Sequence, residues 1–247
     1  CLLSCAQVVP ALPPKGAVGV VDLMEVVDGR LKQQLADPYS LVRPREEWPS
    51  SVPRASTMMA DALEWQPLAR LLLETGICVF LPEASVFRAD GVPVVNGFFG
   101  VGKKKFLEDG REVLRLICNL VPSNSYLHVI RGDVDELPYI MQWSSFLLLD
   151  GEEMRVSQED MTAAFYCFRM PPVWHPFFAV GLPLASEDVG LPSGQTGYLS
   201  VAVLPMGFGS AVGIRQSAAR RILRAPSPEC SPCIKALPRR EVLNLKD

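Results

Sequence analysis

The sequence predicts an α+β domain with a mainly antiparallel sheet. One long amphipathic helix is expected over residues 56–76, and short apolar segments bounded by turn residues follow it as strands. Helical and strand patterns are mixed along the chain, and no internal repeat is visible. Such an order is typical of α+β domains, in which helices cover one side of an antiparallel sheet.

Residues 1–55 are rich in proline and do not favour a continuous helix. The segment ends in RPREEWPSSVPRAS, and only GVVDLMEVVDGRLKQQL, residues 19–35, has the composition of a short helix. We therefore expect residues 1–55 to be either a linker or a segment docked on the rest of the chain.

The helix over residues 56–76 has a start signal, a periodic face and a stop signal. Ser56 and Thr57 are candidate N-caps, and apolar residues recur near helical spacing from Met58 to Leu72. Gly76 follows as a typical C-terminal stop.

Strands are expected on both sides of a second helix. ICVFLP at 77–82, the turn and strand of ADGVPVVNGFFGVGKKK at 89–105, and REVLRLICNLVPSN at 111–124 form the first group. A helix is expected within 135–155, where ELPYIMQWSSFLLL precedes an acidic DGEE turn. A strand pair is expected next. MRVSQEDMTAAFYCFRMP leads into HPFFAVGLPL, and TGYLSVAVLPMGFGSAVGIRQ follows later in the chain.

Composition limits the class of protein. Of the 247 residues, 49% are hydrophobic, which suffices for a sizeable core, and no run reaches the roughly 18 apolar residues of a membrane helix. Seven irregularly spaced cysteines do not describe a disulfide framework and favour an intracellular setting, cytoplasmic or nuclear. The CSPC pair at 230–233 has no second ligand pair for zinc. Because the chain begins CLLSC without a methionine, we expect a fragment of a longer reading frame or a processed chain.

Charge is distributed unevenly along the chain. The net charge is −3, but from Arg215 onward eight Lys or Arg oppose three Asp or Glu, which leaves the first 214 residues at −8. Residues 217–247 are therefore expected to form a basic, disordered tail, or alternatively a contact with nucleic acid.

Short stretches of the chain resemble, in order, motifs of the reverse transcriptases of retroviruses and LTR retrotransposons. They are LLLETG, NGFFGVGKKK, RLICNLVPSN, ELPYI, EDMTAAFYCFRMP and VLPMGFGSAVGIRQ, within residues 56–216. Each motif alone is weak, and their shared order and spacing make the resemblance. It implies a fingers-like region at 56–135 and a partial palm-like region at 136–216, truncated before the family's Tyr-x-Asp-Asp hairpin.

The resemblance also implies a site for RNA-directed DNA synthesis, which is template-directed nucleotidyl transfer by two metal ions. Asp160 is the implied catalytic residue and ligand of Mg²⁺, with Mn²⁺ as a substitute, and the carbonyl of Met161 completes the metal's oxygen shell. The implied nucleotide-binding residues are Lys103, Lys104, Arg115, Phe165, Met206 and Gly207, and Gln216 is implied to contact the template. Phe165 takes the place of an aromatic ring that excludes ribonucleotides by meeting the sugar.

Each of these residues also has a simpler interpretation. The lysines resemble a solvated hairpin tip, Phe165 an ordinary core residue, Gly207 a turn glycine, and Gln216 an exposed polar residue.

The chain departs from the family pattern at several positions. Asn119 stands where the family usually has Asp, Val121 where it has Arg, and Met206 where it has Gln. No Tyr-x-Asp-Asp follows Gln216, and one carboxylate does not hold two magnesium ions. We therefore expect a retroelement-derived chain that is inactive alone, with RNA or DNA template-primer and deoxynucleotide as ligands and a partner chain that supplies the missing palm elements.

Two other interpretations remain. The chain could be a non-catalytic nucleic-acid-binding or interaction domain that retains part of the polymerase fold, or an unrelated α+β domain. No Gly-x-Ser-x-Gly elbow, phosphate-loop lysine motif or paired-cysteine zinc array points to another enzyme class.

Overall fold

The computed structural model describes residues 3–55, 62–137, 147–153, 161, 163–192 and 194–224. Some predicted features lie outside these residues: Asp160, the cap candidates Ser56 and Thr57, most of the helix expected within 135–155, and residues 225–247 with the CSPC pair.

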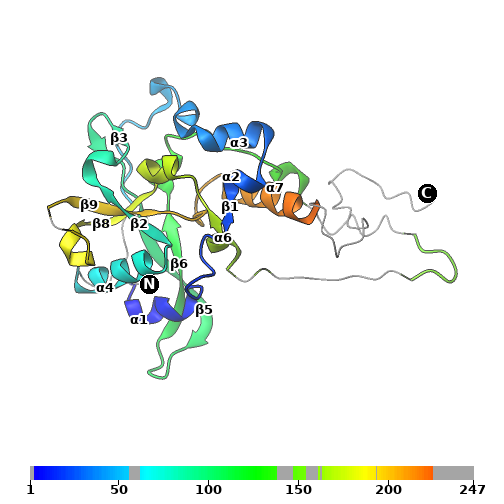
Figure 1. Cartoon of the computed structure of the whole chain (residues 1–247), viewed down its shortest axis with the longest axis horizontal. Helices are drawn as coiled ribbons and strands as arrows, with labels where there is room; N and C mark the ends of the chain where they lie inside the picture. The colour runs from blue at the N-terminus through cyan, green and yellow to red at the C-terminus, as the bar shows by residue number, and fades with distance from the viewer. Residues whose placement is uncertain are drawn as a thin grey trace.

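Helices and strands are mixed along the chain (Figure 1). The helices are α1 (Cys5–Val8), α2 (Leu23–Val26), α3 (Gly29–Ala36), α4 (Ala62–Glu74), α5 (Val121–Asn124), α6 (Ala164–Cys167) and α7 (Ala211–Arg224). The strands are β1 (Val21–Asp22), β2 (Cys78–Pro82), β3 (Arg88–Ala89), β4 (Val92–Pro93), β5 (Gly97–Phe106), β6 (Glu112–Asn119), β7 (Phe168–Arg169), β8 (Ala179–Ala185) and β9 (Thr196–Val201). No helix among the described residues is both long and apolar enough to cross a membrane.

The strands form small sheets that are antiparallel with one exception among the described pairs. Strand β9 lies between β2 and β8 and is antiparallel to both, so the predicted pairing of the strands on either side of the 186–195 connection is present. Strands β5 and β6 form a long hairpin whose far end projects from the body of the molecule (Figure 1). Strands β1 and β7 run parallel. The chain is therefore an α+β protein.

Residues 3–55 pack onto the rest of the chain. Leu3 and Leu35 are fully buried in the main hydrophobic core. The backbone N–H of Cys5 donates to Glu64 at 2.7 Å, and the indole N–H of Trp174 donates to the carbonyl of Leu35 at 2.8 Å. Of the two alternatives for this segment, the described residues show docking.

Helix α4 agrees with its sequence signals. It ends at Glu74, and the backbone N–H of Gly76 donates to the carbonyl of Leu73 at 3.0 Å. Gly76 has a φ of +79°, the left-handed conformation that closes a helix and that glycine adopts without strain.

Two sequence-based predictions were wrong in the described part of the chain. Residues 164–167 form helix α6 where a strand was expected, because a short apolar run has no periodicity that separates the two structures. The strand expected over 196–216 ends at Val201, and residues 211–224 form helix α7. The first residues of the predicted tail at 217–247 are therefore helical.

Candidate functional site

The loop between β9 and α7 packs against strand β6. The backbone N–H of Cys118 donates to the carbonyl of Met206 at 3.2 Å. Gly207 has a φ of +109°, and a side-chain carbon there would collide with the carbonyl oxygen of Cys118. The close neighbour that requires glycine at this position is therefore β6.

Two further side chains, Asn124 and Phe208, fix this loop. The side chain of Asn124 donates to the carbonyl of Gly207 at 2.8 Å and accepts from the backbone N–H of Gly209 at 3.0 Å. The ring of Phe208 meets the rings of Trp174 and Phe178 edge-on, each at 5.2 Å between centroids. The loop is thus held by α5 on one side and by the aromatic core on the other.

Helix α6 brings Phe165 to the same part of β6. It begins after Ala163, whose φ of +53° is unusual for a residue with a side chain. The phenol of Tyr166 donates to the carbonyl of Leu116 at 3.2 Å, which ties α6 to β6. Phe165 is half-buried, packs against the core, and lines one small hollow together with Met206 and Cys118.

The hollow is too small for a nucleotide. Its volume is about 10 Å³, roughly the space of one water molecule. The half-buried side chains of Phe165 and Met206 line it. The structure brings Phe165 together with Met206 and Gly207, although they come from two distant segments. Both segments pack against β6, the strand that carries Arg115.

Arg115 supplies positive charge beside this region. Its side chain is exposed on β6. Burial raises the pKa of the Tyr166 phenol well above its usual range, and the positive charge of Arg115, the weakest of the influences on this pKa, acts in the opposite direction. Burial also raises the pKa of the Cys118 thiol to about 12, which keeps this thiol protonated and unreactive.

Lys103 and Lys104 lie farther out on the hairpin. Cys118 is paired with Phe98, so Lys103 is five residues, or roughly 16 Å, along β5 from that pair. The register shifts between Gly102 and Phe106, and Lys104 has a φ of +54° with its backbone N–H donating to Glu112 at 2.8 Å. The structure does not bring these lysines to Phe165.

Among the described residues, no contact joins Gln216 or Met161 to this site. Gln216 is half-buried on α7, and the side chain of Met161 is 43% exposed. No group of three or more His, Cys, Asp or Glu side chains that could hold a metal ion occurs among the described residues. The described residues therefore do not form a metal site, and Asp160 lies outside them.

Arg215, next to Gln216, joins the site although the sequence analysis did not select it. Its guanidinium carbon lies 5.8 Å from the centroid of the Phe165 ring. The signal that would have identified it is a charged residue on the apolar face of an amphipathic helix, which Ala211, Ile214 and Ala218 mark.

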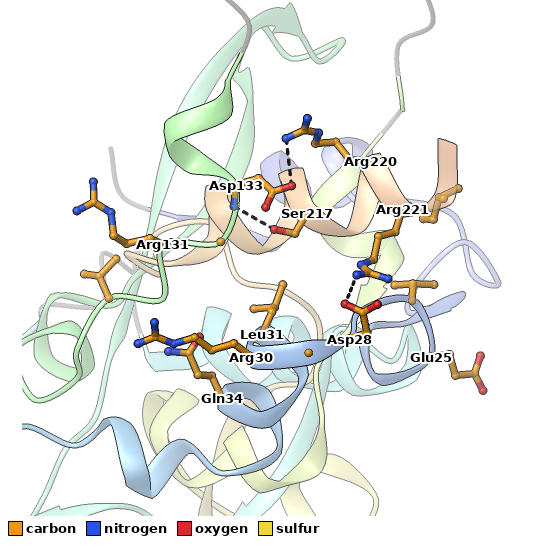
Figure 2. Close-up of a pocket in the computed structure, with 15 residues that line it drawn as sticks. Glu25, Asp28, Arg30, Leu31, Gln34, Arg131, Asp133, Ser217, Arg220 and Arg221 are labelled. Carbon is orange, nitrogen blue, oxygen red and sulfur yellow. Dashed lines mark hydrogen bonds and ion pairs between the residues drawn. The ribbon is translucent and has the colours of Figure 1, made fainter. Parts of the chain in front are cut away.

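A larger cleft lies elsewhere, between α3, residues 129–133 and α7. Its volume is about 1130 Å³, and Figure 2 shows the side chains that line it. Asp133 pairs with Arg220 at 3.3 Å and its backbone N–H donates to Ser217 at 3.0 Å, while Asp28 pairs with Arg221 (Figure 2). These ion pairs neutralise much of the charge in the cleft, and it contains none of the residues selected from the sequence.

The fold has a likeness among solved structures. The chain is similar to the foamy viral protease-reverse transcriptase in complex with double-stranded DNA, with a TM-score of 0.40 and 14% sequence identity, over 88% of this chain and 38% of that one. The chain thus spans less than half the length of that protein. No protein-family model matches the sequence, and no curated protein matches it.

Proposed function

We propose that this chain is a retroelement-derived, reverse-transcriptase-like protein that binds template-primer nucleic acid and an incoming deoxynucleotide. One observation carries the proposal. The motif order predicts that Phe165 and the Met206–Gly207 loop share one nucleotide site, and in the structure both segments pack on β6 around Cys118.

The residues take roles according to their position. Arg115, exposed beside Tyr166, binds phosphate, where a fixed cation gains most from the charge of its ligand. Phe165 presents its ring to the sugar, and Met206 forms the apolar floor beside it. Lys103 and Lys104, farther along the hairpin, contact the phosphate backbone of the nucleic acid, and Gln216 contacts the template.

Catalysis requires groups beyond this site. Mg²⁺, or Mn²⁺, would be held by Asp160 and the carbonyl of Met161, and when bound it would supply charge neutralisation on the triphosphate. The sequence contains no Tyr-x-Asp-Asp after Gln216 to complete such a site. We propose that the chain alone does not polymerise, and that a partner chain with the missing palm elements is needed.

Salt dependence tests the proposed nucleic-acid binding. Fluorescence anisotropy of a labelled DNA primer on an RNA template is recorded as salt rises from about 50 to 200 mM. If about four phosphates are neutralised, affinity falls about a hundredfold over this range, because counterions are released on binding. No binding at low salt, or an affinity that salt leaves unchanged, would contradict the proposal and favour an unrelated α+β domain.

A further inference from the structure

Arg215 occupies a core-facing position on α7. Ala211, Ile214 and Ala218 are buried, and Arg215 lies four residues after the first and three before the last, so it shares their face. A charged side chain on such a face costs free energy unless its hydrogen-bonding groups are satisfied.

The guanidinium of Arg215 lacks one partner. Its Nε atom is buried and has no hydrogen-bond acceptor among the described residues. The other arginines of α7 provide a contrast, because Arg220 pairs with Asp133 at 3.3 Å and Arg221 pairs with Asp28. Of the interactions described for Arg215, the contact with Phe165, at 5.8 Å, orients it toward the proposed nucleotide site.

We infer that Arg215 binds a phosphate group of the incoming nucleotide. The inference rests on the proposed function and adds a phosphate ligand to the same site. A phosphate oxygen is the acceptor that suits a guanidinium N–H best, because the bond is charge-assisted and the geometry allows two parallel contacts. Arg215 on α7 lies over Phe165, and the charge of Arg115 on β6 is felt at the neighbouring Tyr166, so the two cations suit a ligand with several negative charges.

Substitution of Arg215 by methionine separates this role from a structural one. Isothermal titration calorimetry measures the affinities for dATP, inorganic tripolyphosphate and deoxyadenosine in the presence of magnesium. Thermal unfolding of each protein gives its Tm. The Arg215→Met protein is expected to bind dATP and tripolyphosphate about tenfold or more weakly and deoxyadenosine as wild type does, since only a phosphate contact is lost. Tm is expected to stay the same or rise, since a half-buried guanidinium whose buried Nε has no acceptor among the described residues is removed.

Arg221→Met is the matched control, because it removes the same charge from the same helix at the cleft. It should leave the affinity for all three compounds unchanged. The inference is overturned if Arg215→Met binds tripolyphosphate as tightly as wild type, or if its Tm falls and all three affinities fall together. If the wild-type chain binds neither dATP nor tripolyphosphate, the inference and the proposed deoxynucleotide site both fail, whereas wild-type binding that Arg215→Met leaves unchanged overturns the inference alone.

Discussion

At the scale of single residues, Gly207 is the position where the fold requires one amino acid. Its positive φ and the nearby carbonyl of Cys118 exclude a side chain. The sequence pattern implied a nucleotide-binding role for this glycine, because a motif shows where a glycine is needed but not which neighbour needs it. That neighbour is β6, on which the proposed site is built.

Replacing Gly207 by alanine should destabilise the protein by roughly 1–3 kcal/mol, since strain at positive φ adds to the collision with Cys118. Urea unfolding measures the loss. Gly209→Ala is the matched control in the same loop, because its nearest neighbour, Oδ1 of Asn124, would lie at an ordinary 3.6 Å. Equal stability of the two variants would show that Gly207 is not under this constraint.

At the scale of elements, the sequence predicted those with strong local signals. Helix α4 could be predicted because thirteen helical residues carry a periodic face and a glycine stop. Helix α6 could not, because its four residues form one apolar run and its position depends on the tertiary bond from Tyr166 to Leu116. The contact of Phe165 with Met206 around one hollow is equally non-local, so no local sequence pattern could predict it.

Helix α5 controls the position of the Met206–Gly207 loop through one side chain. Asn124→Ala removes two hydrogen bonds to the loop, to Gly207 and from Gly209, so stability should fall by about 1–2 kcal/mol. Dissociation of labelled template-primer should become faster as well, since the loop loses its anchor. Gln33→Ala, an exposed residue of α3, is the control and should change neither quantity. A stable Asn124→Ala variant with unchanged dissociation would show that α5 does not position the loop.

At the scale of the whole molecule, residues 3–55 share one hydrophobic core with the rest of the described chain. Leu3 and Leu35 contribute fully buried side chains to it, although proline-rich composition alone left a linker possible. Composition describes local preference, and docking depends on distant partners such as Trp174. The proposed binding unit therefore includes this segment.

Primer extension tests the proposal that the chain alone does not polymerise. Neither the wild-type chain nor its Asp160→Asn variant should extend a DNA primer on an RNA template with Mg²⁺ or Mn²⁺, because the described residues form no metal-ligand group and Tyr-x-Asp-Asp is absent from the sequence. Extension by wild type that the variant loses would show that a second carboxylate is supplied within the chain or by its assembly.

The most direct test of the central claim asks whether the incoming nucleotide binds at the β6 surface. The affinity for dATP is measured in the presence of template-primer and Mg²⁺ for wild type, Arg115→Gln and, as a charge-matched control, Lys32→Gln on the exposed side of α3. If Arg115 contacts a phosphate of the nucleotide, its substitution weakens dATP binding about tenfold or more, while Lys32→Gln leaves it unchanged. Equal small effects of both substitutions would contradict a nucleotide site at Arg115, Phe165 and Met206.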